Sequence, residues 1–598
     1  MNHHEISAKL SALRTEISAA GLDGFLVPMA DEYQSEYVPA FAQRVAYLSG
    51  FTGSAGFIAV LKDKAAFFTD SRYTLQAAQQ VPQDFFAVFD GAQKTPLQWL
   101  EENLSKGAKL GYDPWLHSAD GIECIKKVGA KVGAEIVPVA RNLVDLIWQD
   151  QPAAPMASIY PYELTYAGKA SADKRAAIAE DLRKKNLAAV VITDPASVAW
   201  LLNVRGGDVP HTPLPLSRVI LRDDASALWF VDARKVVETL AAHVGAQVEI
   251  LSPEQFPVAL EALAKQEKSV LLDPSHAASW ITDHLRTAGG KIEMGEDPCE
   301  LPKAIKNGTE IDGMRAAHRR DGAALVRFFA WLEQHWDGLT ELGAEQKLAS
   351  FREANNLYRE PSFDTIAGAG EHGAIVHYRA TKESDAALLA GQLFLLDSGG
   401  QYLDGTTDVT RTIALGAPLL EMRDRYTRVL KGHIALASIR FPEGTTGSEL
   451  DVLARQYLWE VGLDYGHGTG HGVGCYLGVH EGPQSISRRN KVPLKVGMVV
   501  SNEPGFYKTG HYGIRIENLQ TVVEILGLPG SERKIFGFEP LTLVPFDRNL
   551  IEVSMLSGAE TKWINAYHAR IEKILRPMLD GDALAWLELV TQEIARNE

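Results

Sequence analysis

The chain has 598 residues, of which 46% are hydrophobic and 23% charged, so it is long enough for roughly two to four globular domains. Its formal charge of −16 argues against nucleic acid as a partner, because phosphate binding requires clustered Lys and Arg. No apolar run is long enough to span a membrane, which argues against a membrane partner.

Two further features bear on location. The start of the chain, MNHHEISAKLSALRTEISAAG, has no basic patch followed by an apolar stretch, so we expect no export signal. The cysteines, Cys124, Cys299 and Cys475, are an odd and sparse set, which argues against a disulfide framework and for a reducing compartment. We therefore expect a cytoplasmic protein.

The first part of the chain contains a diverged internal repeat. One copy begins with LSALRTEISAAGLDGFLV and the other with RAAIAEDLRKKNLAAVVI, and each continues through short apolar strands to a helix after an Asp-x-Arg turn. Two similar α/β domains are therefore expected. The proline-bearing segment QPAAPMASIYPYE separates them, and a second such segment, EDPCELPKAIKNGTE, marks the start of a third domain near residue 300.

The pattern changes in the last part of the chain. A long amphipathic helix begins near Glu310, and further helices are expected at about residues 340–357, 420–438 and 447–461. Antiparallel strands lie between and after them, and a helix-rich piece follows Thr561. The predicted fold class is α/β, or α+β for this last domain.

Five side chains able to bind metal ions lie in this last domain, each in an apolar or β-branched run typical of a strand or strand end. Their strings are LFLLDSGGQY, GTTDVTRT, GHGTGHGVG, VVSNEPGFY and YGIRIENLQ, and the residues are Asp397, Asp408, His471, Glu503 and Glu517. Taken singly, each could be a turn cap, a solvated carboxylate or a structural histidine.

The charge of the set indicates bound cations if its members share one pocket. Two like charges about 4 Å apart repel by roughly 4 kcal/mol at an effective dielectric of about 20, so four carboxylates need protons or cations to neutralise them. Two divalent ions would supply that charge. An oxygen-rich set without thiolate suits Mn²⁺ better than a structural zinc ion, with Co²⁺ or Zn²⁺ as alternatives.

The order of these motifs resembles one family. DGTTDVTRT, HGTGHGVG, VHEGP, NEPG and GIRIEN follow one another as in aminopeptidase P (Xaa-Pro aminopeptidase), and nearly the whole chain is similar to the long, three-domain form of this pita-bread metallopeptidase. The resemblance implies creatinase-like domains at 1–155 and 156–303, followed by a pita-bread catalytic domain with a helical extension at 304–598. It also implies a homodimer that hydrolyses the N-terminal Xaa-Pro bond of peptides.

The resemblance also assigns roles to the five residues. It implies that Asp397 binds one ion, that His471 and Glu503 bind the other, and that Asp408 and Glu517 bridge the two. A hydroxide between the ions would be the nucleophile, and Glu503 the group that accepts the proton of water.

Four further residues match family positions around the substrate. His377 in AIVHY and His480 in VHEGP are expected to contact the peptide and to stabilise the oxyanion or move protons, and His467 to lie near the leaving proline. Arg72 in TDSRY matches a substrate-binding arginine, although it could equally hold its own turn. Separately, Arg515 lies two residues before Glu517, where it could support a ligand carboxylate.

Other functions are open at this stage. A prolidase, which cuts only dipeptides, would share all five ligands, but a second copy of the front domain is not expected in it. A non-catalytic pita-bread module that binds peptides or histones would have lost ligands, and none is lost here. Creatinase-like hydrolysis without metal is disfavoured for the same reason. The preference for proline rests on the resemblance, since no spacing in the chain shows a proline pocket.

Overall fold

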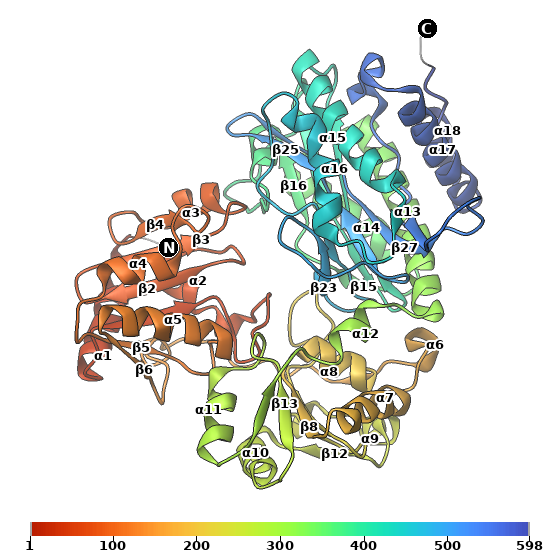
Figure 1. Cartoon of the computed structure of the whole chain (residues 1–598). Coiled ribbons are helices and arrows are strands. Elements are labelled where there is room, and N and C mark those ends of the chain that lie inside the picture. Colours follow the sequence, from red (N-terminus) through yellow and green to blue (C-terminus); the bar gives the residue numbers. More distant parts are fainter. Residues whose placement is uncertain (1–2, 596–598) are drawn as a thin grey trace. The chain divides into compact units, whose positions relative to one another are not determined.

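The computed structural model describes residues 3–595, and the chain divides into two compact units (Figure 1). The first unit contains Met1–Leu164 and Lys169–Cys299, and the second contains Thr165–Gly168 and Glu300–Glu598. Each unit has buried hydrophobic clusters of its own. Within the described residues, no helix is both long and apolar enough to cross a bilayer.

The first unit contains two six-stranded mixed sheets with the same topology. The strand order is β4-β3-β2-β1-β5-β6 in one sheet and β12-β11-β10-β8-β13-β14 in the other. The inner strands β1 and β8 each pair antiparallel with the next long strand, β2 or β10, and parallel with β5 or β13 on the other side. The internal repeat and the two related α/β folds expected from the sequence are therefore confirmed.

The elements of the first unit are short and alternate along the chain. The strands of the first sheet are β1 Gly24–Pro28, β2 Phe57–Leu61, β3 Ala65–Thr69, β4 Ala87–Asp90, β5 Lys109–Tyr112 and β6 Glu135–Pro138. Those of the second are β8 Leu187–Ile192, β10 Arg218–Arg222, β11 Ala227–Phe230, β12 Val248–Leu251, β13 Ser269–Leu272 and β14 Ile292–Met294. The helices are α1 His3–Ala19, α2 Arg44–Ser49, α3 Thr74–Gln80, α4 Pro96–Asn103, α5 Ala119–Val132, α7 Ser171–Lys184, α8 Pro195–Leu202, α9 Glu238–Val244, α10 Phe256–Ala264 and α11 Ser279–Thr287.

Local sequence accounts for these elements. Helix α1 buries Ile6, Leu10, Leu13 and Ile17, which recur at helical spacing and form one apolar stripe against the first sheet. Strand β8, LAAVVI, is buried along its whole length, as expected for an inner strand that is covered on both faces.

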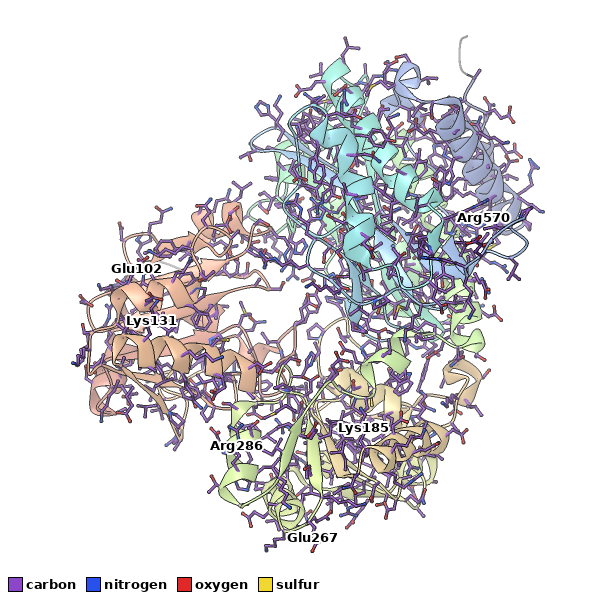
Figure 2. All side chains as sticks on the ribbon, in the orientation of Figure 1. Glu102, Lys131, Lys185, Glu267, Arg286 and Arg570 are labelled. Atoms are coloured by element: carbon purple, nitrogen blue, oxygen red, sulfur yellow. The ribbon has the colours of Figure 1, made fainter. Side chains whose placement is uncertain are left out.

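The surface of the first unit carries many charged side chains (Figure 2). Glu102 on α4 and Lys131 on α5 are both exposed, and each forms an ion pair, with Lys94 and Glu101 respectively. Exposed pairs of this kind contribute about 0–1 kcal/mol each, so the stability of the unit comes from its buried clusters.

The second unit contains the long helices expected from the sequence. The sequence placed helices at about 420–438, 447–461 and 340–357, and the structure has α15, α16 and α14 there, the last ending a few residues early. The helices are α12 Glu300–Ala304, α13 Gly308–His335, α14 Glu341–Glu353, α15 Leu420–Ser438, α16 Gly447–Trp459, α17 Gly558–Leu575 and α18 Gly581–Val590. A short helix, α6 Leu164–Ala167, falls at the boundary between the units.

The sheets of the second unit are antiparallel. A three-stranded sheet has the order β16-β17-β20, and a six-stranded sheet has the order β21-β28-β27-β24-β22-β23. Their strands are β16 Ile366–Ala369, β17 Leu393–Ser398, β20 Val409–Ala414, β21 Phe441–Pro442, β22 Gly470–Gly472, β23 Glu481–Ile486, β24 Val499–Asn502, β27 Asn518–Glu524 and β28 Ile535–Pro540. Smaller groups are formed by β15 Tyr358–Pro361, β18 Gly400–Tyr402 and β19 Gly405–Thr406, and by β25 Gly505–Lys508 and β26 Tyr512–Arg515. In the first unit, β7 Tyr160–Pro161 pairs with β9 Val204–Arg205.

Candidate metal centre

A hairpin in the second unit carries the first two of the five metal-capable residues. Strand β17 pairs antiparallel with β20, and this register puts Asp397 opposite Thr410. Asp408 immediately precedes β20, so both carboxylates lie near the same end of the hairpin. Both residues are buried, at 7% and 4% exposure, where an unpaired negative charge is strongly disfavoured.

The other three residues come from the six-stranded sheet and its margins. His471 is the central residue of β22, Glu503 directly follows β24, and Glu517 lies in the break between β26 and β27 rather than within a strand as expected. Thr410 links the two sheets, because its hydroxyl donates to Glu517 Oε2 at 2.7 Å and its carbonyl accepts from the Glu517 amide at 3.1 Å.

The structure brings the five residues close together. Ligand atoms of Asp408, His471 and Glu517 all lie within 4.8 Å of one another. His471 Nε2 is 3.4 Å from Asp408 Oδ2 and 3.6 Å from Glu503 Oε1. Asp397 is close enough to both Asp408 and Glu517 that its charge raises the pKa of each.

The electrostatics of this five-residue cluster fit bound cations. Burial, followed by the charges of Asp397 and Glu503, raises the pKa of Asp408 well above its usual range. Burial and the neighbouring carboxylates do the same to the pKa of Glu517, and burial with the charge of Glu517 raises the pKa of Glu503 to about 8. Oδ1 of Asp397 and Oδ1 of Asp408 are buried and accept no hydrogen bond from any described residue. A positive ligand would satisfy both the charge and these acceptors.

Arg515 supplies part of the positive charge from β26. Its Nη2 donates to Asp397 Oδ2 at 2.7 Å, its Nε to the Thr410 hydroxyl at 3.2 Å, and its Nη1 to the Tyr507 hydroxyl at 2.7 Å. One guanidinium against four carboxylates leaves an excess of negative charge, so Arg515 orients Asp397 without replacing a cation.

Tyr507 was not singled out by the sequence, yet it joins Arg515 to His467. Its hydroxyl lies 2.8 Å from His467 Nε2, while His467 Nδ1 lies 2.7 Å from the Gly468 carbonyl. In the neutral ring Nδ1 must donate to that carbonyl, so Nε2 accepts from Tyr507. Burial raises the pKa of Tyr507 to about 12, which keeps its proton in place. A single tyrosine on a short strand carries no local signal for this role.

A buried ion pair holds the residue before Asp408. Asp321 on α13 accepts from Arg352 Nε of α14 at 2.8 Å and from the Thr407 hydroxyl at 3.0 Å. Burial alone would raise the pKa of Asp321, but the Arg352 guanidinium and these hydrogen bonds hold it below its usual value. The helices thereby fix the approach of the chain to Asp408.

The remaining predicted residues lie in different places. The His480 ring packs edge-on against the His471 ring, with centroids 4.3 Å apart and planes at 73°. His377 is half-buried in the loop after the 3-10 helix η4 (Gly370–Ala374), and that loop leaves from β16, whose Ile366 pairs with Asp397. Arg72 belongs to the first unit, where its guanidinium donates to Asp70 of the same turn at 2.9 Å and 2.6 Å. The cluster itself draws on the second unit alone.

Comparisons with known proteins agree with this arrangement. Models of the creatinase/prolidase N-terminal domain match residues 9–146 and 150–310, the model of metallopeptidase family M24 matches residues 312–524, and the C-terminal region of that family matches residues 534–594. The fold and the site therefore define a metallopeptidase of family M24 with creatinase-type N-terminal domains.

Relatives that match over nearly their full length identify the branch of this family to which the chain belongs. Aminopeptidase P2 of Arabidopsis thaliana is 40% identical over 99% of this chain and 89% of its own length, and a probable Xaa-Pro aminopeptidase P of Laccaria bicolor is 40% identical over 97% and 92%. The crystal structure of X-prolyl aminopeptidase from Caenorhabditis elegans, described as a cytosolic enzyme with a di-nuclear active site, covers 99% of this chain and 100% of its own at 34% identity and a TM-score of 0.94. The chain belongs to the aminopeptidase P family.

Proposed function

We propose that this protein is an Xaa-Pro aminopeptidase, which removes the first residue from peptides whose second residue is proline. The observation that carries the proposal is the largely buried cluster of four carboxylates and one imidazole, with its two unpaired Oδ1 atoms, in a chain similar over its full length to aminopeptidase P.

The cluster would hold two divalent ions. Asp397, Asp408, His471, Glu503 and Glu517 would be their ligands. Mn²⁺ is the preferred ion, because the donor set is rich in oxygen and has one nitrogen. When bound, two such ions polarise a carbonyl oxygen and lower the pKa of water.

The side chains of this unit provide the rest of the chemistry. Glu503 accepts a proton from the attacking water, since one of its oxygens can stay free for that purpose. His377 and His480 contact the peptide and stabilise the oxyanion, and His467, held by Tyr507, lies beside the leaving proline. Arg515 keeps Asp397 in position through its hydrogen bond to Oδ2.

Substrate selection depends on the shape of the leaving group. An X-Pro bond has no N–H. A pocket that binds peptides through that N–H would therefore bind X-Pro peptides poorly, whereas a pocket shaped to accept the proline ring would bind them well. Arg72 is the substrate-binding arginine that the resemblance implies, and Arg72→Ala should weaken peptide use more than metal binding. Its bidentate bond to Asp70 keeps the guanidinium in one orientation.

Domain limits, location and assembly complete the proposal. The domains are 1–155, 156–303 and 304–598, a division supported by the two sheets of the first unit. A cytoplasmic location is supported by the relative described as cytosolic and by three free cysteines. A homodimer is expected from the family resemblance, and the molar mass in solution tests it.

A peptide panel with the Mn²⁺-loaded protein tests the activity. We expect release of the first residue from X-Pro-Y tripeptides and longer peptides, and a loss of about tenfold or more when the second residue is Ala. Activity confined to X-Pro dipeptides would identify a prolidase. Equal rates on X-Pro and X-Ala peptides would exclude proline selection.

A further inference from the structure

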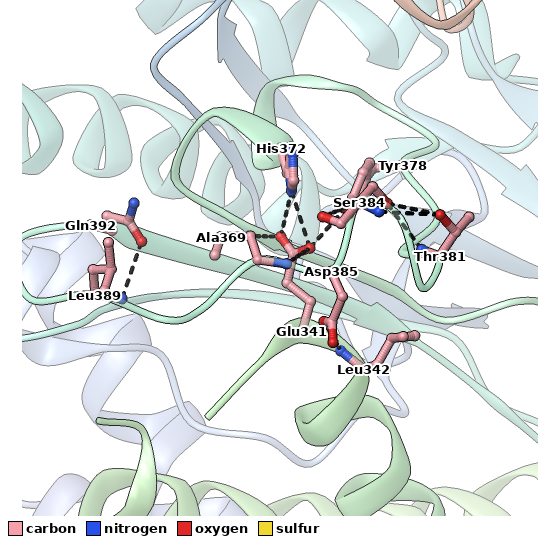
Figure 3. Close-up of polar contacts among 11 residues, drawn as sticks. Glu341, Leu342, Ala369, His372, Tyr378, Thr381, Ser384, Asp385, Leu389 and Gln392 are labelled. Carbon is pink, nitrogen blue, oxygen red and sulfur yellow. Dashed lines mark hydrogen bonds and ion pairs between the residues drawn. The ribbon is translucent and has the colours of Figure 1, made fainter. Parts of the chain in front are cut away.

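Glu341 is a fully buried carboxylate outside the five-residue cluster (Figure 3). It is the first residue of α14, and its side chain binds both ends of one loop. The amide of Ala369 donates to Oε1 at 2.7 Å, and the amide of Ala386 donates to Oε2 at 3.2 Å. The backbone amide of Glu341 also donates to the Ala386 carbonyl at 3.0 Å. Glu341 therefore closes the base of the loop that runs between these two alanines.

The same carboxylate also holds the inside of this loop. His372 Nδ1 donates to Oε1 at 2.8 Å, and the Tyr378 hydroxyl donates to Oε2 at 2.8 Å. The two rings stack with centroids 4.4 Å apart, and Figure 3 shows both side chains directed at Glu341. The hydrogen bond to Glu341 raises the pKa of His372, which favours the charged partner of the carboxylate. One buried side chain thus accepts from four separate points of the loop.

Packing on another face of the loop leaves it little freedom. A Cβ atom at Gly513 of β26 would meet the Gly373 carbonyl oxygen at 1.7 Å, so the loop and the strand touch through their backbones. Strand β26 carries Arg515, which binds Asp397. The loop therefore lies between α14 and a strand of the candidate metal centre.

This loop carries His377, immediately before the buried Tyr378. We propose that Glu341 is a positioning residue, which holds the 370–385 loop through His372 and Tyr378 so that His377 meets the substrate. The inference rests on the proposed role of His377. It gives a reason for burying an acid well outside the stretch of sequence that carries the metal-capable residues. Removing it would leave two backbone amides and an imidazole without this acceptor, and would leave the Tyr378 hydroxyl only its contacts with Ser384, at 3.1 Å and 3.2 Å.

Glu341→Gln tests the inference with little change in size. The amide group keeps one acceptor oxygen but replaces the other with a donor, so it cannot serve all four partners. We expect kcat on X-Pro-Y peptides to fall by about tenfold or more, with metal content close to wild type, because a small displacement of a catalytic group lowers the rate strongly. Tyr378→Phe, which removes one partner, should lower kcat less.

Two further measurements separate positioning from general stability. Hydrogen exchange should rise in residues 369–386 of Glu341→Gln and stay unchanged elsewhere in the second unit. Glu353→Gln, on the exposed last turn of the same helix, is the matched control and should change neither kcat nor exchange. In a double-mutant cycle, Glu341→Gln combined with His377→Ala should lose no more activity than His377→Ala alone.

The outcomes are distinct. A Glu341→Gln variant with the kcat of wild type and unchanged hydrogen exchange in the loop would overturn the inference. A double mutant whose loss of activity equals the product of the two single losses would also overturn it. Loss of metal or a general rise in exchange would assign Glu341 a purely structural role and overturn it too. If the wild-type protein fails to cleave X-Pro-Y peptides, the proposed function fails. In that case the exchange experiment alone decides whether Glu341 holds the loop.

Discussion

Substitution of Glu503 gives the most direct test of the proposed chemistry. It directly follows β24, and its Oε1 lies 3.6 Å from His471 Nε2. Its backbone amide donates to the Thr469 carbonyl at 2.8 Å, so its backbone position does not depend on the carboxylate. Substituting Gln therefore removes the charge and the proton acceptor while preserving shape.

We expect Glu503→Gln to lower kcat by about 10²-fold or more, the usual scale for losing general acid–base assistance. Steady-state kinetics with parallel metal analysis measures this. His471→Ala should instead lower metal content, because it removes the imidazole donor. Glu524→Gln, at the exposed end of β27, serves as the control. A Glu503→Gln enzyme within about threefold of wild type would exclude its role in proton transfer.

At the scale of elements, helix α17 contains a buried base that couples stability to pH. His568 is fully buried, and its Nε2 accepts from the Phe546 amide at 3.2 Å. Burial, followed by the charges of Arg411 and Arg548, lowers the pKa of His568 to about 3. Its pKa in the unfolded chain is about 6.5. Below that pH His568 is therefore protonated in the unfolded state but stays neutral in the folded state.

The sign follows directly: this contribution to stability is complete above about pH 6.5 and is lost as the pH falls toward 3. At about pH 5 the loss from His568 is about 2 kcal/mol. His568→Gln keeps an acceptor but does not titrate, so its urea midpoint should fall less than that of wild type between about pH 7 and about pH 5. The exposed His511→Gln is the control, and equal falls in wild type and His568→Gln would contradict the argument.

At the scale of the whole molecule, metal removal should affect activity and folding differently. The first unit has its own sheets and buried clusters, and the five-residue cluster lies entirely in the second unit. Chelation should therefore abolish hydrolysis, and Mn²⁺ should restore it, while the first unit keeps its structure.

Elemental analysis, activity and hydrogen exchange before and after chelation measure these effects. Activity that survives exhaustive chelation, with no metal bound, would remove the proposed mechanism. Unfolding of the first unit on chelation would show that the two units depend on each other for stability.

Much of the architecture followed from sequence alone, because local patterns specify it. The repeat predicted two α/β folds, and the two sheets have matching strand orders. Helix α15 begins and ends where the apolar period predicted, since its spacing is set by residues a few positions apart. The five metal-capable residues could be named from sequence because each stands in a motif, and the resemblance supplied their roles.

Only the tertiary structure decided how distant residues meet. It showed that Arg515 binds Asp397, that Tyr507 joins Arg515 to His467, and that Glu341 holds a loop whose ends are far from it in sequence. It also showed that the buried Arg411 guanidinium donates mainly to backbone carbonyls, including those of Pro545 and Glu517. Such contacts arise from strand register and helix packing over many residues. No local period or spacing encodes them, and the physical reason is that a buried polar group is satisfied by whichever partner the fold brings within reach.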